Sequence, residues 1–437
     1  MNIVHIIPGS GGSFYCGNCL RDSKYYTSIK QLGHNVLKVP LYLPLFARDP
    51  DQEPVPVFYG AVSIYLKQLY PMFRHAPKWV DNILNATPVL RQAAKRAGST
   101  RAKGLEEMTI SMLLGEQGNQ SDELDEMIVW LENHFRPDVI HISNALLLGL
   151  APMLRSRLRV PVICSLQDED VWVDVMSESN REKVWNLMSE KGKDVDAFIS
   201  VSHFFTAFSM GKMDIPEEKV YTLHLGVDPD DYKFINSLEK DRSIGYLSRM
   251  CEENGLDILI DAFLILKKEA SNNDIILYIT GGSTGDDTAY IKAQKKKIKN
   301  AGLEAQVVFL GHFDNHERHI FFERVSVLSV PVRKGEAFGI YLTEAMASGI
   351  PVVQPALGAF PEIVEATGGG LIYDENTPEK LAGSLQALLS DKKLLGEKSI
   401  NARKGVEEKF NIKKKAASLV EIYEKVAAPQ ATPTARV

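Results

Sequence analysis

The sequence is poor in cysteine and contains no long apolar run. Four cysteines in 437 residues are too few to hold a disulfide scaffold together. Because no stretch of about 18 apolar residues occurs, the sequence predicts no membrane-spanning helix. The amino terminus lacks a basic start, and Pro8 and Gly9 end its apolar run early, so we expect no export signal. These absences together favour a cytoplasmic, reducing location.

An excess of positive charge is also missing. The 50 Lys and Arg residues are outnumbered by 56 Asp and Glu residues, which gives a formal net charge of -6. Nucleic-acid-binding proteins usually carry a basic domain, so we expect no nucleic-acid partner. A hydrophobic content of 45% is ordinary for a globular protein, and this length predicts two or three domains.

A repeated strand–turn–helix pattern is present instead. Residues 1–7 form an apolar run typical of a buried strand, and a glycine-rich turn and a helix-like stretch follow. Gly33 is a typical end signal for that helix, which implies a parallel strand after it. Further strands of this half are predicted at 36–39, 138–142, 160–165 and 197–201.

The pattern starts again in the second half of the chain, where a helix is predicted at 255–270. Short apolar runs that end in Gly or a polar turn are typical of buried parallel strands. Here they occur at 243–247, 275–280, 307–311, 325–330 and 351–353. The sequence therefore predicts an α/β protein with two doubly wound, Rossmann-like domains facing each other across a cleft. Ligands of such folds bind at the carboxyl ends of the strands.

We expect a first domain at 1–227 and a second at 228–410, with a disordered tail at 427–437. A helical insertion at 54–125 interrupts the first domain, and its part from 54 to 105 has eight basic residues and one acidic residue. Apolar and aromatic residues lie between these charges. The segment is either a membrane-surface or acidic-acceptor patch, or an ordinary solvated helical insertion.

The strongest functional signal is the turn at 335–339 and the helix predicted at 340–348. The free N–H groups of a helix start favour an anion, and the diphosphate of a sugar nucleotide matches them chemically. Gly339 has no Cβ and allows a close approach of the backbone. Glu344, one turn into the helix, could accept hydrogen bonds from a ribose diol. Glu336 could accept bonds from sugar hydroxyls or stabilise positive charge at the anomeric carbon.

Two glutamates at this spacing also occur by chance, so the strand–turn–helix context carries the interpretation. In that context, residues 336–353 resemble the signature of glycosyltransferase family 4. The resemblance continues at 226–228, 247–249, 255–257, 358 and 361–364. It implies a GT-B fold, transfer with retention of anomeric configuration, and no metal. It also implies that a helix at 411–426 returns to the first domain, and it does not cover 54–125.

The resemblance further implies roles for single residues. Glu344 would hold the ribose, and Arg249 would contact the diphosphate. Glu336 would hold the donor sugar and phosphate together with the backbone at Phe338, Gly339 and Ile340. The remaining donor-binding positions that we predict are Gly11, Gly12, Asn254 and Gly282.

Two positions depart from the family pattern. Asn254 stands where the family usually has a lysine, which removes a positive charge that Arg333 or Lys334 could replace. Gln167 stands where the family has a histidine, and glutamine cannot titrate. We predict that Gln167 and Asp168 belong to the catalytic site with Glu336. Asp168, Glu169 or Asp170 could orient an acceptor hydroxyl, or the segment is a polar strand end.

Cys16 and Cys19 form a CxxC motif after the first glycine loop. A redox pair and half of a zinc site are the sharper interpretations, but no second CxxC completes four ligands. Two thiols packed at a helix start are the interpretation that we favour, and we predict no metal.

The sequence thus predicts a retaining, hexosyltransferase-type enzyme. It would move a sugar from a nucleoside-diphosphate sugar to a hydroxyl of an unidentified glycan, lipid or small molecule. A sugar-nucleotide isomerase or hydrolase of the same fold, or a catalytically silent binding protein, are the alternatives. If residues 54–105 contact a membrane, the location would be its inner face.

Overall fold

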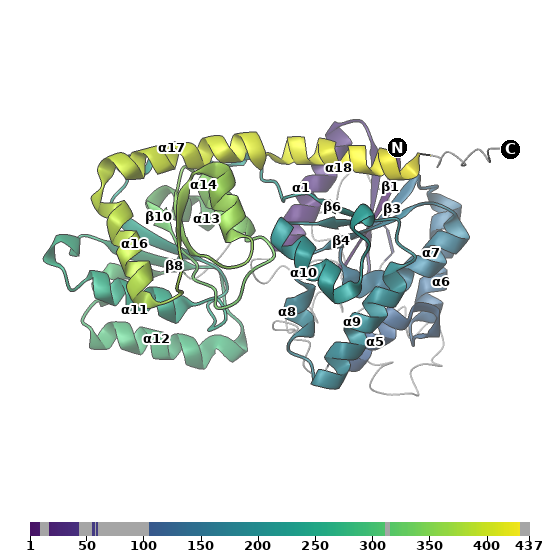
Figure 1. The fold of residues 1–437 in the computed structure, drawn as a ribbon, viewed down its shortest axis with the longest axis horizontal. Helices are drawn as coiled ribbons and strands as arrows, with labels where there is room; N and C mark the ends of the chain where they lie inside the picture. Colours follow the sequence, from purple (N-terminus) through teal and green to yellow (C-terminus); the bar gives the residue numbers. More distant parts are fainter. Residues whose placement is uncertain (9–16, 43–54, 57, 60–104, 311–314, 429–437) are drawn as a thin grey trace.

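Apolar runs bounded by glycine and polar turns form the strands, and these strands assemble into two sheets. The structure, a computed structural model, describes the chain except residues 9–16, 43–54, 57, 60–104, 311–314 and 429–437. Within the described residues each sheet has six strands, and all neighbouring strands are parallel. Figure 1 shows the two halves side by side, so the predicted α/β fold with two doubly wound halves is confirmed.

The strand order is β2-β1-β3-β4-β5-β6 in the first sheet and β12-β11-β10-β7-β8-β9 in the second. The first sheet contains β1 (Asn2–Ile7), β2 (Asn35–Pro40), β3 (Val139–Ile142), β4 (Val162–Leu166), β5 (Ala197–Ser200) and β6 (Val220–Thr222). The second contains β7 (Ser243–Leu247), β8 (Ile276–Thr280), β9 (Val307–Phe309), β10 (Val327–Leu328), β11 (Val352–Pro355) and β12 (Gly370–Tyr373). The central strands are buried on both faces, as expected for parallel sheets that helices cover.

Helices cover both sheets (Figure 1). In the first half they are α1 (Gly17–Gln31), α5 (Glu106–Leu114), α6 (Ser121–His134), α7 (Ala151–Leu158), α8 (Glu169–Val173), α9 (Glu178–Gly192) and α10 (His203–Met213). In the second half they are α11 (Leu256–Leu266), α12 (Thr288–Asn300), α13 (Asn315–Arg324), α14 (Ile340–Ala347), α15 (Phe360–Thr367), α16 (Pro378–Ser390) and α17 (Lys392–Lys409). Among the described helices, none combines the length and the apolar character that crossing a bilayer requires.

The strand order of each sheet reverses beside its first strand. In the second sheet β7 lies between β8 and β10, so the segments that follow β7 and β10 leave the sheet next to each other. Ligands of open α/β sheets bind in the crevice at such a switch point. Arg249 follows β7 and Glu336 follows β10. The topology therefore places both predicted site segments at this crevice.

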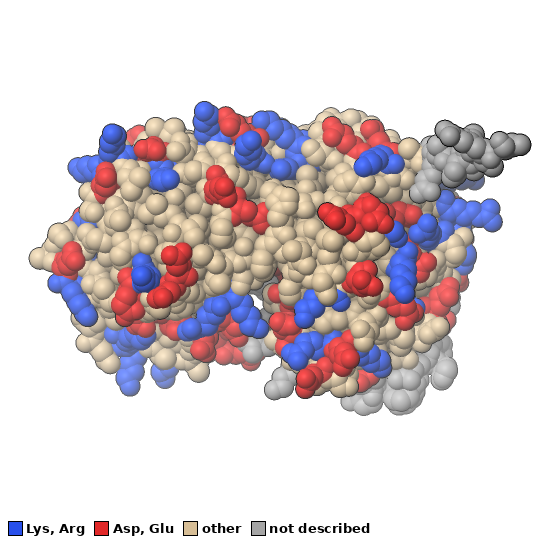
Figure 2. All heavy atoms as spheres, in the orientation of Figure 1, with Lys and Arg blue, Asp and Glu red and all other residues tan. Residues whose placement is uncertain are grey.

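The carboxyl ends of the two sheets face each other. Ser202, which follows β5, donates a hydrogen bond of 2.6 Å to the carbonyl oxygen of Ala337 in the second half. The Nζ atom of Lys334 lies 3.5 Å from a carboxylate oxygen of Asp174 in the first half. Figure 2 shows a notch between the two halves, with charged side chains on both of its walls.

Two stretches of backbone cross between the halves side by side. Val227 and Asn411 form an isolated parallel bridge, and the Ile412 amide donates to the Val227 carbonyl at 2.9 Å. The predicted boundary at 227–228 lies in this crossing. α18 (Ile412–Ala427) then runs along the first half, where it packs against α1 (Figure 1). Its Tyr423 hydroxyl lies 2.6 Å from Nδ1 of the buried His141. The return of the last helix to the first half is what the family resemblance implied.

Candidate functional site

Glycines shape the loop between β10 and α14. Gly339 caps α14 with a φ of +86°, and a Cβ at this position would lie 2.9 Å from the Phe360 ring. A Cβ on Gly358 would lie 2.5 Å from the backbone of Glu336. Non-glycine side chains are strained at such positive φ angles, so both glycines are required for this geometry. Together they place Glu336 between the start of α14 and the turn at Gly358.

Glu336 follows β10 and lies close to carboxylates of the first half. Burial raises the pKa of Glu336 to about 8, and the charge of Asp168 raises it further, whereas Tyr341 lowers it. Asp170 also contributes to the rise. Burial and the nearby carboxylates therefore both favour the neutral carboxylic acid form of Glu336. The sequence did not predict this protonation, because Asp168 is 168 residues away along the chain.

The end of β4 supplies the acidic edge that faces Glu336. Asp168 has a φ of +54°, a left-handed conformation that costs a non-glycine residue free energy. Burial and the charge of Asp168 raise the pKa of Asp170 to about 6. Glu169 is 2% exposed, and burial raises its pKa to about 8, although amides of Ala145 and Gln167 donate to it. The structure thus brings Asp168 and Asp170 to Glu336, while Glu169 lies in the interior.

Gln167 points into the protein. Its side chain is 5% exposed, and its Nε2 donates to the carbonyl oxygen of Ser143 at 2.9 Å. This bond ties the end of β4 to the end of β3. The glutamine therefore fixes the strand ends beneath Asp168 and cannot exchange a proton with a ligand.

Glu344 is buried on the inner face of α14. The Tyr232 hydroxyl donates to its Oε1 at 2.6 Å, and Nη1 of Arg318 lies 3.1 Å from the same oxygen. Both partners are distant from Glu344 in sequence and adjacent to it in the fold. Tyr232 follows the crossing segment, and Arg318 lies on α13. Two donors on one oxygen fix the position of the carboxylate.

Arg249 lies beside the switch point and is held by an acidic partner. Its Nε and Nη2 donate to the two carboxylate oxygens of Asp287, each at 2.8 Å, and Nη2 also donates to Thr284 at 3.0 Å. Asp287 is 3% exposed, whereas 30% of the Arg249 side chain is exposed. A two-point ion pair orients the guanidinium plane. Gly282 adjoins this loop, because its carbonyl accepts from the Met250 amide at 3.0 Å.

Replacing Asp287 with alanine should weaken binding of a nucleoside diphosphate about tenfold and leave binding of the bare nucleoside unchanged. The reason is that Arg249, the diphosphate contact predicted from the sequence, would lose the bonds that fix its guanidinium, and one charged hydrogen bond is worth about 1.5–3 kcal/mol. Titration of both ligands against the wild type and the variant measures the difference. Equal weakening of both ligands would show that Asp287 acts only on the fold.

Asn254 reinforces the same loop and supplies no charge. Its Nδ2 donates to Ser248 Oγ at 2.7 Å and to the Arg249 carbonyl at 3.3 Å. Of the two predicted substitute cations, Arg333 pairs with Asp257 at the start of α11 and donates to the Glu252 carbonyl at 3.0 Å. Lys334 is largely exposed and reaches toward Asp174 across the notch. Of these two cations, Arg333 is therefore the one that lies beside the loop that carries Arg249.

Several predicted residues lie outside the described part of the chain. These are Gly11, Gly12 and Cys16, most of the insertion at 54–125, and most of the tail at 427–437. Cys19 lies in α1, whose first side chains are also outside the described part. The roles of these residues stay predictions.

The sequence reasoning missed Tyr232, Asp287 and Arg318. None of them lies in the motif at 336–353. Tyr232 and Arg318 contact Glu344, and Asp287 contacts Arg249, only because the fold brings distant segments together. Thr284 and Asp287 do form a capping box, which their spacing could have revealed. Tyr232 and Arg318 carry no such local signal.

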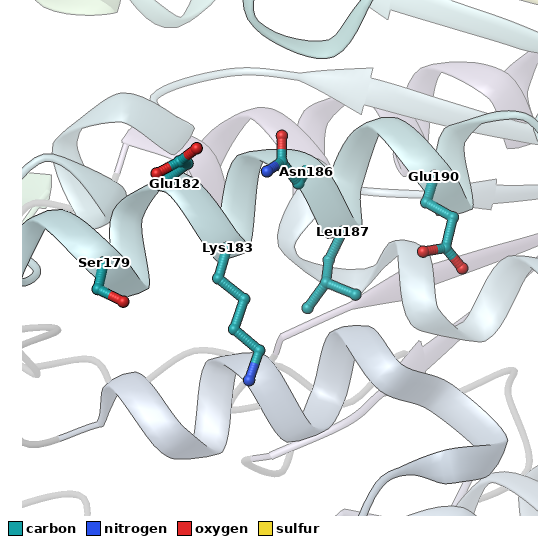
Figure 3. A pocket seen from close by; sticks show the side chains of 6 residues that line it. All are labelled: Ser179, Glu182, Lys183, Asn186, Leu187 and Glu190. Carbon is teal, nitrogen blue, oxygen red and sulfur yellow. The ribbon is translucent and has the colours of Figure 1, made fainter.

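A shallow surface hollow of about 330 Å³ lies along α9 in the first half. It is lined by six side chains of α9, namely Ser179, Glu182, Lys183, Asn186, Leu187 and Glu190 (Figure 3). All of them belong to one exposed helix and none is a predicted site residue. We therefore take the convergence of charged groups at the switch point, and not this hollow, as the candidate functional site.

Comparison with known proteins relates both halves of the chain to glycosyltransferases. The model of the family described as Glycosyl transferases group 1 matches residues 228–405, and that of Glycosyltransferase Family 4 matches residues 123–231. A mannosyltransferase of lipopolysaccharide core biosynthesis from Rhizobium meliloti is 29% identical over 204 residues. That match covers 46% of this chain and 53% of the relative, so the chain spans about half the length of this relative.

Two further similarities extend over more of the chain. An amylovoran biosynthesis glycosyltransferase from Erwinia amylovora is 26% identical over 334 residues, which cover 72% of this chain and 78% of the relative. The crystal structure of HepE from Anabaena in complex with UDP superimposes with a TM-score of 0.67 at 17% identity. That superposition covers 97% of this chain and 100% of HepE. At this identity the structural similarity shows the shared fold.

Proposed function

We propose that this chain, which belongs to the family 4 type of GT-B glycosyltransferases, transfers a sugar from a nucleoside-diphosphate sugar to an acceptor hydroxyl with retention. The start of α14 carries this proposal. It lies at the switch point of the second sheet, begins at Gly339, where φ is +86°, and has the fixed carboxylate of Glu344 one turn further on. This arrangement suits a diphosphate joined to a ribose.

The electrostatics favour transfer without a covalent enzyme intermediate. A mostly neutral Glu336 is a poor nucleophile, although it can still donate to and accept from sugar or phosphate groups. In the reaction that we propose, the leaving phosphate is stabilised by the helix-start amides and Arg249. Asp168, which follows β4, orients the acceptor hydroxyl, whose proton passes to the leaving phosphate.

We propose that the reaction needs no metal ion. Positive charge for the diphosphate comes from Arg249 and Arg333, which lie on the two segments that leave the switch point. These contacts involve only groups common to nucleoside-diphosphate sugars. The proposal therefore names this class of donor and no particular sugar, nucleobase or acceptor.

A matching nucleotide should raise the unfolding temperature by several degrees. At 100 times the dissociation constant, a ligand stabilises the folded state by about 2.7 kcal/mol, which moves the midpoint by a few degrees for domains of this size. A thermal-shift panel of UDP, GDP, ADP and their sugars measures this, with the matching nucleosides as controls. UDP is tested first because HepE binds it. No shift with any nucleotide at several millimolar would refute donor binding.

A further inference from the structure

A second cluster of side chains joins the two halves away from Arg249 and Glu344. His203 is the first residue of α10, and His224 lies between β6 and the crossing segment. Glu362, in the first turn of α15, approaches both from the second half. None of the three has a role in the reaction proposed above, and an inference about them does not depend on that reaction.

The three side chains offer the donor atoms that bind a transition metal. Each supplies one imidazole nitrogen or carboxylate oxygen, and these atoms all lie within 4.8 Å of one another. Nε2 of His224 is 2.8 Å from Oε2 of Glu362, and the two imidazole rings are 5.6 Å apart at 80°. Ligand atoms around tetrahedral zinc are about 3.3 Å apart, given bonds of about 2.0 Å, so small movements of the side chains suffice.

The surroundings of the carboxylate suit a metal ligand. The backbone amides of His203 and Phe204 donate to Oε2 and Oε1 of Glu362 at 3.1 and 3.2 Å. Hydrogen bonds of this kind orient the ligands of metal sites. His203 is exposed, which provides a path of entry from solvent.

We propose that His203, His224 and Glu362 form a binding site for a divalent transition metal ion such as Zn²⁺, which fastens the two halves together. Two imidazoles and one carboxylate are a ligand set that zinc uses, with water in the fourth position. The histidines belong to the first half and the glutamate to the second. Metal binding therefore stabilises the relative position of the two halves. In this position the rings of His224 and of Phe338, in the loop between β10 and α14, have centroids 6.1 Å apart.

Calorimetric titration of the full chain with ZnCl₂ tests the site. The titration uses a Cys16→Ser, Cys19→Ser background, so that the thiols of the CxxC motif do not compete. We expect one Zn²⁺ per chain and a rise in unfolding temperature on binding. His203→Ala should weaken binding at least tenfold, since even changes in the residues around metal ligands cost about 10–100-fold. Glu365→Gln, an exposed glutamate on the same helix, should bind zinc as the background does.

His203→Ala is the decisive variant, because it removes an exposed side chain and leaves the amides at the start of α10 in place. Glu362→Gln and His224→Ala should also weaken binding, and the unfolding temperature without zinc shows whether each variant is folded. Absence of zinc binding to the background protein would overturn the proposal. Unchanged zinc affinity in a folded His203→Ala variant would overturn it as well.

Discussion

Replacing Glu336 with alanine should lower kcat about 100–1,000-fold, the usual effect of removing one group that stabilises the transition state. Replacement with glutamine should cost much less, about tenfold, because Glu336 is mostly a neutral acid at pH 7. Glutamine keeps the shape, an acceptor oxygen and a donor. Initial rates of sugar transfer or release, measured with a donor found in the nucleotide panel, give both values.

The same protonation predicts a pH dependence of donor binding. The folded-state pKa of Glu336 is about 8, and an anionic diphosphate beside it raises that value further. Below pH 8 the proton is already present when the donor binds. Above pH 8 binding requires proton uptake, so the dissociation constant should rise by up to about tenfold per pH unit. Glu336→Gln should remove this rise.

The Glu336→Gln variant therefore serves as the control for Glu336→Ala. The dependence of the rate on pH is a second, independent check on both variants. If Glu336→Gln were as inactive as Glu336→Ala, the ionised carboxylate would be the working form. In that case the rate would increase with pH through about 8, which is the opposite of our expectation. Equal pH profiles for the wild type and Glu336→Gln would assign the titration to another group, such as Glu169.

Most of the strands could be predicted from the sequence because buried parallel strands are continuous apolar runs. The run at 243–247 coincides with β7, and that at 275–280 differs from β8 by one residue. The helix predicted at 255–270 ends earlier, at Leu266, because the amides of Lys268 and Glu269 bond three residues back, to the carbonyls of Ile265 and Leu266. β6 was missed because its residues 220–222 are only partly buried, so no apolar run marks this edge strand.

The site was predictable only where a motif is local. Gly339, Glu336 and Glu344 lie within one turn and one helix, and the strand–turn–helix pattern around them predicts their place at a helix start. The neutral state of Glu336 depends on carboxylates that another sheet contributes. Likewise, Asp287 orients Arg249 from 38 residues away. Such effects arise from the folded arrangement, which the one-dimensional pattern does not contain.

Glu344 should be the residue by which the protein distinguishes a ribonucleotide from its 2′-deoxy analogue. Hydrogen bonds to a charged carboxylate are worth about 1.5–3 kcal/mol, so Glu344→Ala should raise the dissociation constant of the ribonucleotide about 10–100-fold. The 2′-deoxy nucleotide lacks one hydroxyl of the diol, and the same substitution should affect its binding less. The ratio of the two dissociation constants therefore reports the contact, whereas a general loss of stability changes both constants alike.

Tyr232 and Arg318 should act on that ratio through Glu344. Both contact Oε1, so removal of either donor lets the carboxylate rotate away from the diol. Tyr232→Phe deletes only a hydroxyl, and we expect it to narrow the ratio several-fold while the 2′-deoxy nucleotide binds as before. Tyr221→Phe, the same deletion on β6 of the first half, is the matched control. If Tyr232→Phe weakened both nucleotides equally, the hydroxyl would support the fold around α14 and would not position Glu344 for the ribose.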